Sequence, residues 1–119
     1  MSMSIIANLE KLLGGPRDGA LLRYSLGNEW LKTGDTAQAA VRLREAVERD
    51  PGYSAAWKLL GKTLAESGQP GAALCAYEKG TAVAEQKGDL QAAKEMTVFA
   101  RRIRRQLAET GAANITSNA

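Results

Sequence analysis

The sequence predicts an all-α fold, a stack of antiparallel helical hairpins, and three observations carry this prediction. The chain repeats itself, with Leu26-Gly27 recurring as Leu60-Gly61. Apolar residues recur at helical spacing through both copies of the repeat. A glycine followed by a polar residue, Gly34-Asp35 or Gly68-Gln69, separates two helical segments within each copy. We therefore expect about six helices, including one at each end that caps the stack.

The repeat is carried by identical residues. Shifting the chain by one repeat length superposes Leu26 on Leu60, Gly27 on Gly61, Gly34 on Gly68, and Ala39 on Ala73. A glycine inside a helix costs about 1 kcal/mol relative to alanine, so Gly27 and Gly61 predict that another helix approaches closely at these two points. We expect the small side chains Ala39 and Ala73 to occupy that contact.

These residues resemble the motif of the tetratricopeptide repeat, which has a length of about 34 residues and characteristic Trp, Leu-Gly, Tyr, Ala, Phe and Pro positions. The match covers residues 20–53 and 54–87. Residues at motif positions are Leu26, Gly27, Trp30, Ala39, Leu43, Ala46 and Pro51 in the first copy, and Trp57, Leu60, Gly61, Leu64, Ala73 and Tyr77 in the second. The chain departs from the motif at Arg23 (usually Trp), Gly80 (usually Ala) and Glu85 (usually Pro). The resemblance implies a right-handed stack.

Two such units bury too little apolar surface by themselves, so the flanking segments are expected to complete the core. Residues 1–15 predict an N-terminal capping helix. Residues 88–110, opened by Asp89 as the helix cap, predict a C-terminal capping helix with one apolar face. Residues 111–119 show no periodicity and are expected to form a flexible tail.

The resemblance also implies a binding surface. In tetratricopeptide repeat proteins, the first helix of each hairpin lines a concave groove that binds extended peptides or partner helices. Carried over to this chain, the groove residues are Tyr24, Asn28, Lys32, Lys58, Leu59 and Lys62. Because the amide and amine groups of this set donate hydrogen bonds, we expect a protein partner of acidic character, or one with a free C-terminal carboxylate.

A basic cluster in the last predicted helix offers an alternative site. It consists of Arg101, Arg102, Arg104 and Arg105, and accounts for part of the formal net charge of +3. Such a cluster favours a nucleic-acid backbone or an anionic surface. No ladder of exposed aromatic residues accompanies it, so nucleic acid is the less favoured partner. A solvated outer face of the capping helix explains the cluster equally well.

Composition narrows the function further. The chain has no histidine and one cysteine, Cys75, so it lacks the residues of most nucleophilic and metal-dependent catalysis. We expect no enzyme activity, no cofactor and no metal site, and we expect Cys75 to be at least half-buried. The single cysteine favours a cytoplasmic location, and no apolar run is long enough to span a membrane.

The sequence therefore predicts a non-catalytic protein-interaction module, an adaptor or scaffold. Two alternatives stay open at this point. One is an element for homo-oligomerisation, in which the same surfaces form a homodimer. The other is a weak nucleic-acid or anionic-surface binder that uses the basic C-terminal helix.

Overall fold

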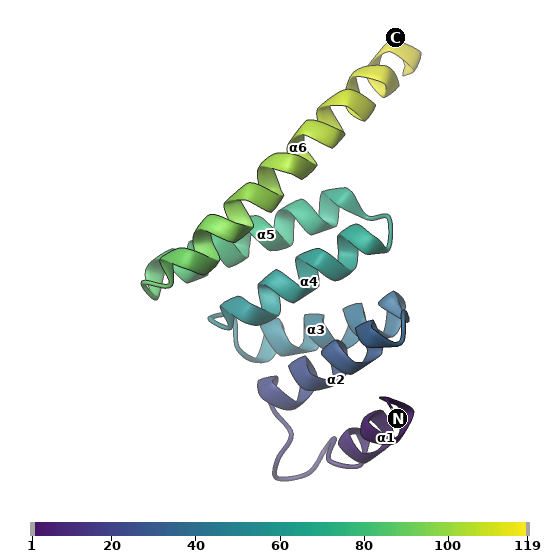
Figure 1. Cartoon of the computed structure of the whole chain (residues 1–119), viewed down its shortest axis with the longest axis vertical. Helices are drawn as coiled ribbons and strands as arrows, with labels where there is room; N and C mark the ends of the chain where they lie inside the picture. Colours follow the sequence, from purple (N-terminus) through teal and green to yellow (C-terminus); the bar gives the residue numbers. More distant parts are fainter. Residues whose placement is uncertain (1, 119) are drawn as a thin grey trace.

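A computed structural model describes the backbone of residues 2–118 and the side chains of residues 3–111. This part of the chain forms six helices and no strands, which confirms the all-α fold class. The helices are α1 (Ser2–Glu10), α2 (Ala20–Lys32), α3 (Thr36–Arg49), α4 (Ser54–Glu66), α5 (Pro70–Gln86) and α6 (Leu90–Asn118). Successive helices stack along the long axis, with α1 and α6 at opposite ends (Figure 1), so the molecule measures 53 × 32 × 22 Å.

The turns that the sequence marked with glycine have the backbone that glycine permits. Gly34, Gly68 and Gly88 have φ values of +86°, +77° and +76°, and each follows the last turn of a helix. A residue with a Cβ rarely adopts this conformation. Asp35 and Asp89 then cap the next helix, because their carboxylates accept hydrogen bonds from the backbone N–H groups three residues later, at 3.0 and 3.2 Å.

Among the side chains of residues 3–111, the core consists of two clusters. The larger one runs through α3, α4, α5 and α6, and its fully buried side chains include Leu43, Leu64 and Met96. The smaller one joins α1 to α2 through Ile6, Leu22 and Leu26. The C-terminal helix is thus part of the main core, whereas α1 covers the other end of the stack through a cluster of its own.

The two repeated glycines allow close contact, but with a different partner from the expected one. A Cβ at Gly27 would lie 2.5 Å from Cγ of Leu43, and a Cβ at Gly61 would lie 2.6 Å from the ring of Tyr77. The expected alanines are not the main contacts; near Gly27 the backbone oxygen of Ala39 lies at 3.2 Å. The missing side chain therefore makes room for a large residue on the opposite helix, not for a second small one.

Gly80 plays the same role one step further along the stack. A Cβ there would lie 2.5 Å from the sulfur of Met96 on α6 and 2.8 Å from Cβ of Trp57 on α4. The departure from the usual motif alanine is explained by the methionine that packs over this position. Gly80 thus lets α5 hold α4 and α6 together.

Three details differ from the sequence-based expectation. α6 continues in helical form past residue 110 to Asn118, because the segment from Gly111 onward contains no proline and includes the strong helix former alanine. The helical part of the N-terminal cap ends earlier than expected, at Glu10, and turns follow it. Cys75 is exposed on α5, since it points away from the buried face formed by its neighbours Ala73, Ala76 and Tyr77.

Candidate functional site

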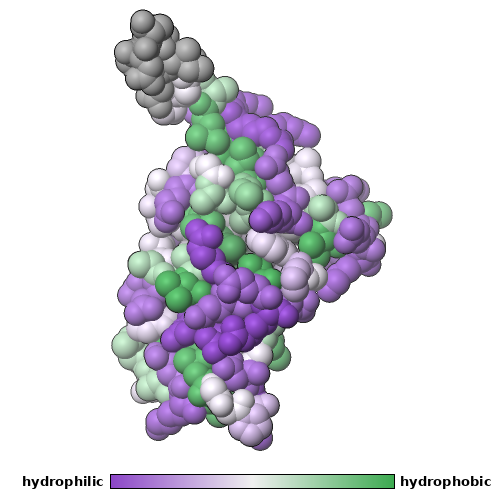
Figure 2. All heavy atoms as spheres, turned by 180° about the vertical axis from the view of Figure 1, so that it is seen from behind, coloured by the Kyte–Doolittle hydropathy of each residue, from purple (hydrophilic) through white to green (hydrophobic). Residues whose placement is uncertain are grey.

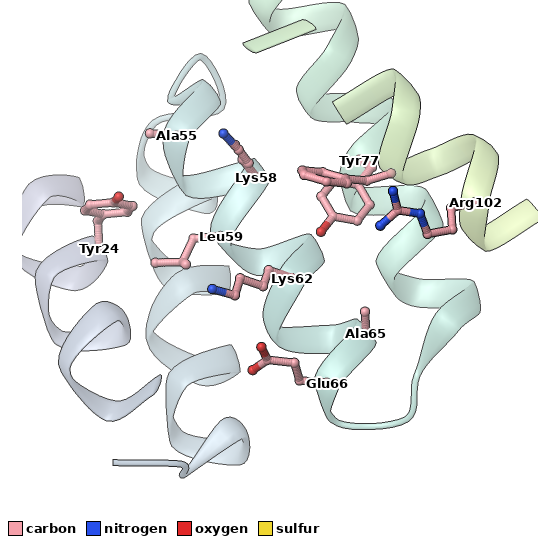
Figure 3. Close-up of a pocket in the computed structure, with 10 residues that line it drawn as sticks. Tyr24, Ala55, Lys58, Leu59, Lys62, Ala65, Glu66, Tyr77 and Arg102 are labelled. Carbon is pink, nitrogen blue, oxygen red and sulfur yellow. The ribbon is translucent and has the colours of Figure 1, made fainter. Parts of the chain in front are cut away.

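A cavity of about 620 Å³ opens between the helices on one side of the stack. We call it the groove, and Figure 3 shows the side chains around it. Its lining comes from α2, α4, α5 and α6 and consists of Tyr24, Ala55, Lys58, Leu59, Lys62, Ala65, Glu66, Tyr77, Phe99 and Arg102. Four helices, from both hairpins and the C-terminal cap, therefore contribute to one surface.

Helix α4 supplies most of this lining because its residues recur at the helical spacing of three or four. Ala55, Lys58, Lys62 and Glu66 fall on one face of α4. The opposite face carries buried residues, Leu60 and Leu64 among them, and anchors the helix in the core. The same amphipathic pattern that folds α4 thus directs its polar residues into the groove.

Aromatic side chains form the walls of the groove. Tyr24 packs against Tyr53 with ring centroids 5.0 Å apart, and Tyr77 packs against Phe99 at 5.4 Å. Burial, together with the nearby carboxylate of Glu66, raises the pKa of Tyr77 to about 12. The phenol is therefore protonated at neutral pH and keeps a hydrogen-bond donor at the wall of the cavity.

The cationic side chains of the groove differ in whether an ion pair already neutralises them. Lys58 forms an ion pair at 3.1 Å with Glu95 of α6, so its charge is largely compensated. Lys62 is exposed and makes no ion pair within residues 3–111, and Arg102 likewise makes none there. In Figure 3 Lys62 projects from α4 and Arg102 reaches toward Tyr77 from α6, so an occupant of the cavity meets a cation on both sides.

Of the six residues that the sequence predicts in the groove, four line the cavity and two do not. Tyr24, Lys58, Leu59 and Lys62 line the cavity. The other two, Asn28 and Lys32, lie further along α2 and do not line it, and Lys32 instead forms an ion pair with Glu29 at 3.0 Å. The helix α2 therefore contributes to the cavity only near its N-terminal half.

Sequence reasoning missed the contribution of the C-terminal helix. Phe99 and Arg102 were not among the predicted groove residues, and Arg102 was named only in the alternative basic cluster, yet both line the cavity. The signal was present in the spacing: Arg102 follows Phe99 by three residues, which places both on neighbouring parts of one helix face.

The four arginines do not form a single patch. Arg102 belongs to the groove, whereas Arg101 lines a second cavity on another side of α6. Arg104 forms an ion pair with Glu78 of α5 at 2.7 Å, and Arg105 is exposed to solvent. Successive residues of a helix point about 100° apart, so a run of arginines is spread around the helix axis.

Comparisons with known proteins identify the family. The model of the tetratricopeptide repeat matches residues 31–96 of the chain, which is more than half of its length. A TPR repeat-containing protein of Pseudomonas aeruginosa is 50% identical over 101 residues, which cover 85% of this chain and 96% of that protein. The chain belongs to the tetratricopeptide repeat family. The resemblance seen in the sequence is thereby confirmed.

Solved structures agree with this assignment. The solution structure of a Bordetella parapertussis protein superposes on this chain with a TM-score of 0.74, and the two sequences are 42% identical. The match covers 87% of this chain and 90% of that one. A tetratricopeptide repeat domain protein of Salinibacter ruber shares 28% identity with a TM-score of 0.67, over 74% of this chain and 88% of that one. The arrangement of the six helices is therefore that of a tetratricopeptide repeat fold.

The family also bears on function in general terms. Tetratricopeptide repeat domains generally mediate protein–protein interactions, and their members are typically scaffolds without enzymatic activity. Among residues 2–118, no helix is both long enough and apolar enough to cross a membrane.

Proposed function

We propose that this protein is a non-catalytic adaptor that binds a partner protein, as an extended peptide or a helix, in the groove between α2, α4, α5 and α6. The observation that carries the proposal is the chemistry of that cavity. Its walls are aromatic and aliphatic. Within residues 3–111, its cations Lys62 and Arg102 have no ion-pair partner, and Glu66 is the one carboxylate in the lining. Apolar walls with a few charged groups are typical of a recognition site.

The proposal also specifies the partner's chemistry. Lys62 and Arg102 favour an acidic side chain or a C-terminal carboxylate, since charge-assisted hydrogen bonds to carboxylates are stronger than neutral ones. The aromatic pair Tyr77 and Phe99 favours an apolar residue of the partner beside that acidic group. Lys58 is less suited to bind the partner than the sequence indicated, because it already forms an ion pair with Glu95.

A cytoplasmic location is part of this proposal. The chain's single cysteine, Cys75, is exposed and forms no disulfide within the chain. A surface thiol of this kind is more compatible with a reducing compartment than with an oxidising one.

The test compares a double charge reversal inside the groove with a single charge reversal outside it. The tagged protein captures partners from its native lysate, and the captured proteins are quantified by mass spectrometry and then titrated as purified ligands. The double variant Lys62→Glu with Arg102→Glu should weaken the binding of the groove ligand by at least about tenfold, or roughly 1.4 kcal/mol.

The control is Arg105→Glu, which makes the same single charge reversal as Arg102→Glu on the same helix, at an exposed residue that lines neither cavity. It should leave the affinity almost unchanged. If the control were as damaging as the double variant, or if a captured partner bound the double variant normally, the groove would not be the binding site. Sedimentation at several protein concentrations separates a monomeric receptor from a homo-oligomer.

A further inference from the structure

The outer face of α6 carries a second cavity, separate from the groove. We call it the notch; its volume is about 490 Å³, and Glu85, Leu90, Ala93, Lys94, Thr97, Val98 and Arg101 line it. No residue lines both the notch and the groove. A ligand in one cavity therefore does not displace a ligand in the other.

The floor of the notch is apolar and exposed. Leu90 is 61% exposed and Val98 is 45% exposed, and both belong to the small group of large apolar side chains that the described residues leave open to solvent. Figure 2 shows hydrophobic atoms at the surface where α5 ends and α6 begins, the corner at the right of that view. Exposed large apolar side chains that line one cavity are typical of an interaction site.

The repeat indicates which kind of element fits there. The second helix of each hairpin packs against the first at a glycine: α3 meets α2 at Gly27, and α5 meets α4 at Gly61. Each of these glycines is the eighth residue of its helix, and the eighth residue of α6 is Thr97, which lines the notch. No helix within residues 2–118 covers this face of α6. The notch thus lies where the second helix of another hairpin would pack.

The rim of the notch sets the charge of the occupant. Lys94 and Arg101 are exposed and, within the described side chains, have no ion-pair partner, whereas Glu85 is the one acidic residue in the lining. An uncharged apolar helix would bury these two cations without a counter-ion, so it does not fit this face. Two cations beside two aliphatic side chains match a helix with acidic residues flanking an apolar stripe.

We infer that the notch is a second docking surface, and that its occupant is an acidic amphipathic helix of a partner protein. Pairing of two copies through this face is disfavoured, because antiparallel α6 helices centred on Val98 would place Lys94 of one copy near Arg101 of the other. The notch contains no aromatic residue on which a base could stack, which argues against a single-stranded nucleic acid. With the groove also occupied, the protein would join two partners.

The experiment uses the full chain and a synthetic probe. From Leu90 to Arg101 the notch extends about 16 Å along α6, or about three helical turns. The probe is a capped peptide long enough to cover those turns, with Leu at helical spacing on one face, Glu beside that face and Ala elsewhere. A matched peptide carries Lys in place of every Glu. Binding is followed by calorimetry and by backbone amide chemical shifts.

The expected result is saturable binding of the Glu peptide, with shifts centred on Leu90, Lys94 and Val98, and at least about tenfold weaker binding of the Lys peptide. Arg101→Glu should reduce the affinity for the Glu peptide by about tenfold, and Val98→Ser should reduce it several-fold. The control variant Arg105→Glu should change it by less than about twofold, because that residue does not line the notch. Both altered residues are exposed, and a thermal melt checks that the variants fold.

Other outcomes would overturn the inference, each in a recognisable way. Equal affinity for the Lys peptide, or absence of saturable binding, would refute the charge match. Shifts at Leu59 and Tyr77, abolished by Lys62→Glu, would place the helix in the groove. Tighter binding of a duplex DNA oligonucleotide that depends on Arg101 but not on Val98 would identify a nucleic-acid surface. A concentration-dependent dimer lost in Val98→Ser would identify a second copy as the occupant. None of these outcomes changes the test of the groove.

Discussion

The two hairpins solve the same packing problem with different chemistry. At the position where the motif usually has Trp, the second hairpin has Trp57 and the first has Arg23. Trp57 is half-buried; its indole N–H donates to the backbone oxygen of Pro51 at 2.8 Å, and the amine of Lys79 lies 5.6 Å from its ring. Arg23 is buried and serves instead as the centre of an ionic network.

That network ties the N-terminal cap to the first hairpin. The guanidinium of Arg23 donates two hydrogen bonds to Asp18, at 2.6 and 2.9 Å, and one to Glu45 of α3 at 2.7 Å. Asp18 also accepts from the backbone N–H of Gly14, and Arg42 joins Glu45 at 3.0 Å. The comparison shows that the residue at the usual tryptophan position bridges the two helices of a hairpin. The guanidinium group of an arginine can replace an aromatic ring there when carboxylates surround it.

The largest expected effect comes from the ends of the stack. Deleting residues 89–119 removes α6, exposes the buried faces of Ala76 and Tyr77, and empties the space beside Gly80. Residues 1–88 should therefore aggregate or lose their cooperative melt. Deleting residues 1–15 instead uncovers the smaller cluster at Leu22 and Leu26 and should only lower Tm.

Circular dichroism melts and sedimentation compare the two truncated chains. If residues 1–88 stayed soluble, melted cooperatively and had a higher Tm than the chain lacking α1, α6 would not be the essential cap.

The second prediction concerns the matched glycines of the hairpins. Gly61→Leu forces a side chain into the ring of Tyr77, which is buried and packed against Phe99. We expect a loss of roughly 3 kcal/mol or more in the free energy of unfolding, at the upper end of what overpacking costs. The control is Gly71→Leu on α5, where a Cβ has no heavy atom within 4 Å.

Urea denaturation measures both variants. Equal stability of the two would mean that α4 and α5 do not meet at Gly61 as described.

How far the sequence predicts this molecule can be seen from these same residues. The repeat predicts the hairpins because Leu26 and Leu60, or Gly27 and Gly61, have the same role in each. It cannot predict that Tyr77 fills the space beside Gly61, since the partner depends on how two helices are rotated against each other. Four groove residues, Tyr24, Lys58, Leu59 and Lys62, follow from the position of the first helices, whereas Arg102 does not, because α6 follows no repeat.

The third prediction concerns Trp57, the aromatic residue at the tryptophan position of the second hairpin. Trp57→Ala should lower the free energy of unfolding by about 2 to 3 kcal/mol, below the roughly 3 to 5 kcal/mol typical of fully buried tryptophan, because the side chain is half-buried. Trp57→Phe keeps most of the contact with Gly80 and loses the hydrogen bond to Pro51, so it should cost about 1 kcal/mol. Denaturant titrations at neutral pH give both values, and an equal cost for the two variants would show that the ring itself contributes little.

The smallest expected effect is the most specific. It is a pH-dependent change in stability that we expect in the first hairpin and not in the second. Hydrogen bonds from Arg23, then from the backbone of Gly14, hold the pKa of Asp18 far below its ordinary value of 3.8. Partial burial would raise the pKa of Glu45, but hydrogen bonds from Arg23 and Arg42 outweigh burial and lower it below its ordinary value of 4.5. A lowered pKa means that the folded state favours the ionised form, so the network stabilises the fold above these ordinary values and loses that effect as the pH falls below them.

Asp18→Asn should therefore lower Tm by a few degrees at pH 7, and the gap between variant and wild type should narrow as the pH falls below about 4. High salt should narrow it only slightly, since Arg23 and Asp18 are both largely shielded from solvent. Trp57→Ala is the matched control in the second hairpin, and its Tm penalty should stay constant over the same pH range because no carboxylate takes part in that contact. Calorimetric melts from pH 7 to pH 3 record both gaps. A penalty for Asp18→Asn that does not change with pH would mean that the carboxylate acts by shape alone, and the ionic explanation of Arg23 at the tryptophan position would fail.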